Sequence, residues 1–123
     1  MKVGNIKMKL ALCTHNSRIA PKYYDATALV LVTIHNGTVE HRRDIAVETL
    51  TPDELCTLVR HMKVDVVICG GIRKDYQEKL KEASIELIYN VIGNVDDVVK
   101  KFLEGRLYTG EIVRTQTERE DFV

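Results

Sequence analysis

The sequence lacks the features that most directly assign a protein to a membrane or to nucleic acid. No apolar run approaches the ~20 residues of a transmembrane helix, and the first residues contain no stretch typical of a signal peptide. Lys plus Arg equals Asp plus Glu at 18 each, so no overall positive charge is available to hold a polyanionic nucleic acid. We therefore expect a cytoplasmic protein that binds neither membrane nor nucleic acid.

Cysteine is scarce and its number is odd. Cys13, Cys56 and Cys69 follow one another at spacings of 43 and 13 positions, which fit neither a disulfide framework nor paired Cys-x-x-Cys zinc knuckles. Cys56 is expected beside the apolar stripe of a helix over residues 51–62, and not within it. A reducing compartment is the simpler setting for these thiols.

Catalytic motifs are missing as well. The sequence has no Ser-His-Asp set, Walker lysine loop or His-Glu-x-x-His helix, and Gly-Gly-Ile-Arg at residues 70–73 is no dinucleotide fingerprint. A two-metal nuclease needs carboxylates on its sheet, but the first expected strand has none and Asp65 begins its strand instead of ending it. We predict that the protein is not an enzyme.

The sequence does contain the alternating elements of one α/β domain, for which 123 residues is a suitable length. Residues 1–114 are assigned to this domain, and the polar, aperiodic residues 115–123 to a flexible tail. Strand patterns cover residues 8–13, 27–34, 38–47, 64–72 and 85–92, with a further short one at 108–113, and helical patterns cover residues 51–62, 73–83 and 95–103.

Local signals mark where elements begin and turn. Asn36-Gly37 favours a type I′ hairpin between two strands, the second of which carries charge on both faces, as an edge strand does. Thr51, Pro52 and Glu54 supply an N-cap, a first-position proline and a capping box for one helix.

Residues 64–72 are the stretch around which this fold is expected to form. They are a short apolar run that stops on Gly70 and Gly71, which indicates a buried strand and a sharp turn. Open α/β sheets bind ligands at such strand ends. The two glycines could present N–H groups to an anion, with Arg73 and Lys74 beside them, or could simply permit the turn.

The first strand ends at a second group of candidate residues. Cys13 is followed two positions later by His15, on the same side of an extended chain. Thiolates and imidazoles suit iron–sulfur and related soft clusters, so Cys13, His15 and Cys69 are candidate metal ligands. Alternatively, the two cysteines are small buried apolar groups and His15 is a solvated loop residue. In the following loop, Lys22 and Tyr23 could grip an anionic ligand or be merely solvated.

In order and spacing, these elements resemble the dinitrogenase iron-molybdenum cofactor biosynthesis family. The resemblance covers residues 8–107, and it rests on the lysine-led first strand, the Ala-Pro-Lys-Tyr-Tyr-Asp-Ala segment at 20–26, the 64–72 strand and the closing helix that ends Phe-Leu-Glu-Gly-Arg-Leu. Family members typically read Ser-Pro-His-Phe-Gly-Arg-Ala at 20–26, so the histidine, glycine and arginine are absent here.

The resemblance implies a three-layer ribonuclease H-like fold with a five-stranded mixed sheet of order 3-2-1-4-5, strand 2 antiparallel and helices on both faces. The first and fourth strands would then be neighbours, which would bring Cys13 close to Cys69. It also implies a non-catalytic carrier or accessory protein. This protein would be a monomer or a homodimer, and its partners would be cofactor-assembly proteins. Its ligand would be an iron–sulfur or iron–molybdenum type cluster, a precursor or another anion. The residues implied in binding are Cys13, His15, Lys22, Tyr23, Cys69, Gly70 and Gly71.

Two alternatives remain open at this point. The missing loop histidine favours a protein interaction or regulatory module that has kept the scaffold without the ligand. An enzyme acting on a small anion is the other, and it would require a lowered pKa of the Cys13 thiol.

Overall fold

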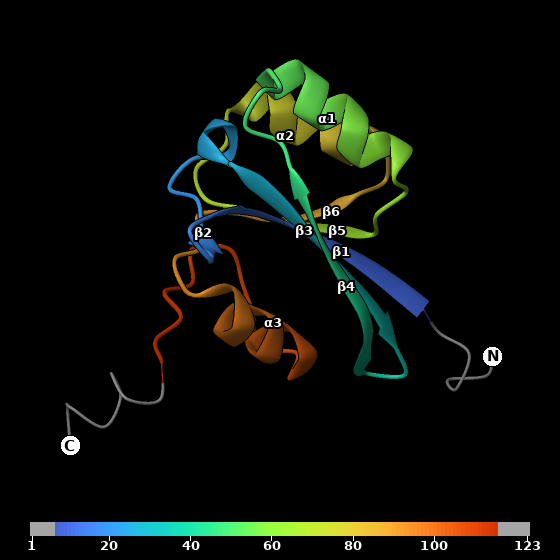
Figure 1. Cartoon of the computed structure of the whole chain (residues 1–123), viewed down its shortest axis with the longest axis vertical. Coiled ribbons are helices and arrows are strands. Elements are labelled where there is room, and N and C mark those ends of the chain that lie inside the picture. The colour runs from blue at the N-terminus through green and yellow to red at the C-terminus, as the bar shows by residue number, and fades with distance from the viewer. Residues whose placement is uncertain (1–6, 116–123) are drawn as a thin grey trace.

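A computed structural model describes residues 7–115 of the chain. Figure 1 shows three layers, with α1 and α2 on one face of a sheet and α3 on the other. The elements in chain order are β1 (Lys7–His15), β2 (Arg18–Ile19), the 3-10 helix η2 (Tyr23–Asp25), β3 (Ala28–His35), β4 (Thr38–Ala46), α1 (Pro52–His61), β5 (Val66–Ile68), α2 (Lys74–Glu82), β6 (Glu86–Ile88) and α3 (Val95–Leu103). Most of the segment assigned to a tail, residues 116–123, lies outside the described residues.

The sheet runs in the order β4-β3-β1-β5-β6, and β2 pairs with β1 beside this path. The five strands of the path follow the predicted order 3-2-1-4-5. β3 is antiparallel to β1, whereas β5 is parallel to it, so the mixed sheet is also confirmed. The prediction of five strands was wrong, because the sheet has six. The ribonuclease H-like classification stays a prediction.

The additional strand, β2, forms because the chain reverses immediately after β1. Asn16 and Ser17 both have positive φ, at 50° and 65°, and His15 pairs with Arg18 across them. This is the geometry of a two-residue type I′ hairpin. A strand of two residues has no periodicity for a sequence pattern to detect.

The larger hairpin has the predicted turn. Asn36 and Gly37 take φ values of 55° and 77° between β3 and β4. Nearly every residue of β4 is exposed, which confirms it as the edge strand. The expected strand at residues 108–113 does not form. Only a single β-bridge is found there, between Ile92 and Ile112.

Helix α1 has its predicted start. The Glu54 N–H donates to Thr51 Oγ1 at 3.1 Å, and the Thr51 N–H donates to Glu54 Oε1 at 2.9 Å. The prediction that Cys56 lies beside the buried stripe was wrong, since only 3% of it is exposed. The buried arc of α1 is wider than one stripe because α2 packs beside it as well as the sheet beneath it. No helix within residues 7–115 is long and apolar enough to cross a membrane.

The sheet separates two hydrophobic cores. Ala11 and Cys13 of β1 belong to the core under α1 and α2, whereas Leu10 and Leu12 belong to the core under α3. This alternation follows from the two-residue period of a strand. It directs the Cys13 side chain toward α1 and α2.

Candidate functional site

The carboxyl end of β5 lies beside β1, as the family resemblance implied. The register pairs Leu12 with Ile68, so Cys13, near the end of β1, and Cys69, the residue directly after β5, occupy the next positions along the two chains. Both side chains belong to the core under α1 and α2. The structure therefore brings together the two cysteines that the sequence placed at strand ends.

A loop segment, residues 20–23, lies across these strand ends. The Ala20 N–H donates to the Cys13 carbonyl oxygen at 3.0 Å, which attaches the segment to β1. The Gly71 N–H donates to the Pro21 carbonyl oxygen at 2.9 Å, and the Tyr23 N–H donates to the Gly71 carbonyl oxygen at 2.7 Å. The loop is thus hydrogen-bonded to both strand ends, and the Gly71 N–H proposed for an anion already has a partner.

Gly70 lets the loop come this close. A Cβ atom at Gly70 would overlap the Ala20 carbonyl oxygen and would stand 2.7 Å from the Pro21 carbonyl carbon. Backbone atoms cannot move aside as a flexible side chain can, so only glycine fits. Gly70 therefore does more than permit a turn, whereas a Cβ atom at Gly71 would make only ordinary contacts. This contact was not predicted from the sequence, although a glycine at a strand end often marks a close approach of another backbone.

The two thiols are closed off from solvent. Cys13 and Cys69 are both 0% exposed. Burial raises the pKa of Cys13 from 9.0 to about 12 and also raises the pKa of Cys69. Because the thiolate is the form that binds metals and attacks electrophiles, both cysteines are inert in this conformation at neutral pH. The lowered pKa that the enzyme alternative requires is not found.

His15 stands at the exposed rim of the site. Its Nδ1 lies 3.1 Å from Thr27 Oγ1, and its Nε2 lies 3.1 Å from Asn16 Nδ2. Within residues 7–115, no group of three or more His, Cys, Asp or Glu side chains is arranged to hold a metal ion. The residues present thus form no ready metal site, and ligation by Cys13, His15 and Cys69 stays a prediction.

Lys22 and Tyr23 point in different directions. Lys22 is exposed, with its Nζ 5.5 Å from the centroid of the Tyr24 ring. Tyr23 is 1% exposed, and its hydroxyl donates to the Pro52 carbonyl oxygen at 3.0 Å. Its ring also lies 5.5 Å from that of Tyr76, centroid to centroid. Lys22 can therefore meet a ligand from solvent, whereas Tyr23 anchors the loop to α1.

Comparison with known proteins gives this arrangement a family. Residues 7–105 match the family model described as dinitrogenase iron-molybdenum cofactor. The chain belongs to the dinitrogenase iron-molybdenum cofactor family. The resemblance seen in the sequence is thereby confirmed. Membership of the iron-molybdenum cofactor family fits a cofactor-carrying accessory protein better than a catalyst.

Several known proteins are similar to this chain in sequence or in fold. The uncharacterized protein MJ0580 of Methanocaldococcus jannaschii is 25% identical over 114 residues, which are 86% of this chain and 95% of that protein. The crystal structure of MJ0327 from the same organism has a TM-score of 0.70 at 23% identity, covering 83% of this chain and 93% of that one. The apo orange protein of Desulfovibrio gigas has a TM-score of 0.68 at 15% identity, covering 90% and 99%. At these identities, the two structures show the fold alone.

Proposed function

We propose that this protein is a non-catalytic carrier or accessory protein in the biosynthesis of a nitrogenase-type cofactor. Its cargo is a metal cluster, a cluster precursor or another anionic ligand, bound at the carboxyl ends of β1 and β5. The observation that carries the proposal is the meeting of Cys13 and Cys69 at these ends, in a chain whose family is that of the dinitrogenase iron-molybdenum cofactor.

The exposed rim is the first part of the site that such a cargo meets. His15 and Lys22 are both exposed, and they stand at the end of β1 and in the loop that covers β5. A cationic amine and an imidazole, both exposed near the strand ends, favour an anion that also offers a soft metal atom. Ligation by His15 would displace either Thr27 Oγ1 or Asn16 Nδ2 from its ring, but it leaves the loop over the strand ends in place.

Ligation by the thiols requires a change of the loop. Residues 20–23 must separate from Gly71, breaking the two hydrogen bonds that link Gly71 to Pro21 and Tyr23. Solvent and metal would then reach Cys13 and Cys69, and a bound metal would hold them as thiolates. Cargo binding and loop opening are therefore coupled in this proposal.

The test is anaerobic isolation of the full chain, with metal analysis and an absorption spectrum before and after incubation with iron and sulfide. The double variant Cys13→Ala, Cys69→Ala removes the thiols, and His15→Ala, Lys22→Ala removes the rim. Cys56→Ala is the matched control, because Cys56 is buried on α1 and not at a strand end. We expect both double variants to lose bound metal and the control to keep it. Metal content unchanged in both double variants would overturn the proposal.

A second candidate function is a protein interaction or regulatory module on the same scaffold. The complete burial of both thiols beneath a hydrogen-bonded loop favours this alternative. It predicts a colourless protein that takes up no metal under the same anaerobic conditions while keeping its fold. The same experiment therefore separates the two functions.

A further inference from the structure

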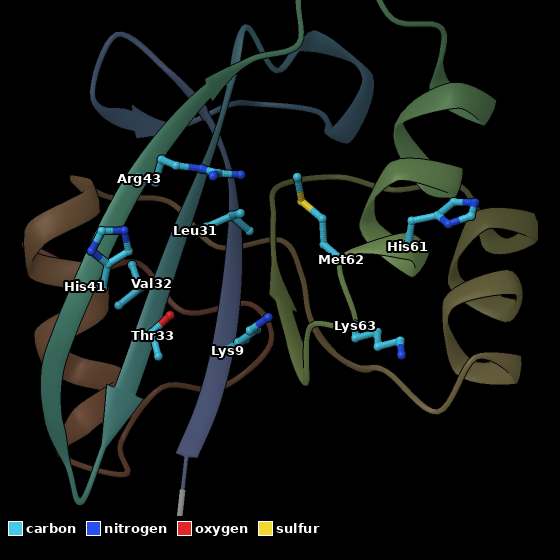
Figure 2. Close-up of a pocket in the computed structure, with 9 residues that line it drawn as sticks. All are labelled: Lys9, Leu31, Val32, Thr33, His41, Arg43, His61, Met62 and Lys63. Atoms are coloured by element: carbon cyan, nitrogen blue, oxygen red, sulfur yellow. The ribbon is translucent and has the colours of Figure 1, made fainter.

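A groove unrelated to the strand ends lies between the sheet and the C-terminal end of α1. Strands β1, β3 and β4 form one side, and the chain that leaves α1 forms the other (Figure 2). Its volume is about 380 Å³. Five of its nine lining residues carry basic side chains, and none carries a carboxylate. This single sign of charge is unusual in a protein with 18 acidic and 18 basic residues.

The sheet register gathers these basic groups. Lys9 pairs with Thr33, which pairs in turn with His41, so the three form one row across β1, β3 and β4. Arg43 stands in the neighbouring row on the same face of the sheet, opposite Leu31. Lys63 arrives from the far side, directly after α1 ends (Figure 2). The Lys9 and Arg43 side chains extend from the sheet toward the groove, whereas those of His61 and Lys63 extend away from the sheet on its far side (Figure 2).

These groups have no internal counterions within residues 7–115, where no ion pair joins Lys9, Arg43 or Lys63 to an acid. Arg42, next to Arg43 but on the opposite face, is paired with Asp96 at 2.7 Å. Asp65, which accepts the Lys9 N–H at 2.8 Å, does not line the groove. A groove lined by unpaired like charges concentrates anions from solution.

The floor of the groove is less polar than its edges. Leu31 and Met62 both line it and are partly buried, so each offers an apolar surface to a ligand. The volume lies within the roughly 300–1,000 Å³ of small-molecule sites. Such a site suits a ligand with a flat apolar body and several negative charges, and it is too small for a nucleic-acid duplex.

We propose that this basic groove binds a nucleoside triphosphate. The base and sugar lie against Leu31 and Met62, and the phosphates are bound by Arg43 and Lys9, which extend toward the groove from one face of the sheet. Arginine and lysine are the usual phosphate ligands of proteins, arginine through its planar fork and lysine as a point charge. The site shares no residue with the strand-end site, so either can fail without the other.

Titration of the isotopically labelled full chain with ATP, followed by NMR, tests this proposal. We expect saturable shifts of amide signals at Lys9, Thr33 and Arg43, with weaker binding at higher salt because the contacts are charged. Adenosine lacks the charges and inorganic triphosphate lacks the apolar body, so each should bind more weakly than ATP. Inorganic triphosphate binding as tightly as ATP would overturn the assignment of a nucleoside.

Two double variants and one single variant locate the site. Arg43→Gln with Lys9→Gln should weaken ATP binding by roughly tenfold or more, because two charge-assisted contacts are lost. Arg42→Gln is the matched control on the opposite face and should leave the affinity unchanged. His15→Gln with Lys22→Gln tests the strand ends, and it should also have no effect. Absence of binding in the wild type, equal affinity in the groove variant, or loss of binding in the strand-end variant would overturn the proposal.

Discussion

A side chain at Gly70 would collide with the carbonyl oxygen of Ala20. This contact joins the end of β5 to the loop that follows β1, two segments about fifty residues apart in sequence. Since the loop covers Cys13 and Cys69, the absence of a Cβ atom at one position determines how closely the candidate site is sealed.

Gly70→Ala should therefore be strongly destabilising. The new methyl group meets backbone atoms of residues 20–21, and relief requires displacement of the loop, so we expect a loss of about 3 kcal/mol in the free energy of unfolding. Gly71→Ala is the matched control, because its nearest atom would be 3.6 Å away, an ordinary contact. Urea denaturation of both variants measures the difference. Equal stability of the two variants would contradict this account of Gly70.

The hydroxyl of Tyr23 should contribute to stability, while that of Tyr24 should not. Tyr23→Phe loses the hydrogen bond to the Pro52 carbonyl oxygen, which ties the loop to α1, at a cost of about 1 kcal/mol. Tyr24 is 52% exposed, so Tyr24→Phe should change the free energy of unfolding by less than about 0.5 kcal/mol. Chemical denaturation compares the two, and a larger effect at Tyr24 would refute the anchoring role.

Both strand-end thiols should resist alkylation in the folded protein. At pH 8 they are buried and protonated, so iodoacetamide should label Cys13 and Cys69 far more slowly than in urea. Gly70→Ala should accelerate this labelling, since it displaces the covering loop. Mass spectrometry of digested protein reports each site. Rapid labelling of native Cys13 would mean that the loop opens readily without cargo.

Much of the fold could be predicted because its signals are local. Asn36-Gly37 determines a turn, and Thr51 with Glu54 determines a helix start, from residues within four positions of each other. The strand order then followed from the family resemblance. β2 could not be predicted in this way, because two residues carry no period and Asn16-Ser17 is a weaker turn signal than Asn-Gly.

The candidate site was less predictable because its contacts are long-range. The sequence patterns placed Cys13 and Cys69 at strand ends, and the family resemblance implied that these ends are neighbours, but the burial of the two thiols depends on residues 20–23 reaching Gly70 and Gly71. The basic groove depends in the same way on sheet register. Lys9 and Arg43 are far apart in sequence, and the pairing of β1, β3 and β4 brings them to one face of the sheet. Lys63 reaches the groove separately, from the chain that leaves α1.

Stability should fall at alkaline pH because of the buried thiols. Folding raises the pKa of Cys13 from 9.0 to about 12, so between these values the unfolded chain binds fewer protons than the folded protein. The free energy of unfolding then decreases as the pH rises, and the contribution is intact below pH 9.

At pH 10 the loss from Cys13 alone is about 1 kcal/mol relative to neutral pH. Burial also raises the pKa values of Cys69 and Tyr23, which steepen the decline in the same direction. Urea denaturation of wild type and Cys13→Ala at several pH values between 7.5 and 10 tests this. Cys13→Ala removes part of a buried side chain, so this variant is less stable than the wild type from the start. The test therefore compares the slopes of the free energy of unfolding against pH, and not its absolute values. We expect a shallower slope for Cys13→Ala, and parallel curves would show that the Cys13 thiol ionises as easily in the folded protein as in the unfolded chain.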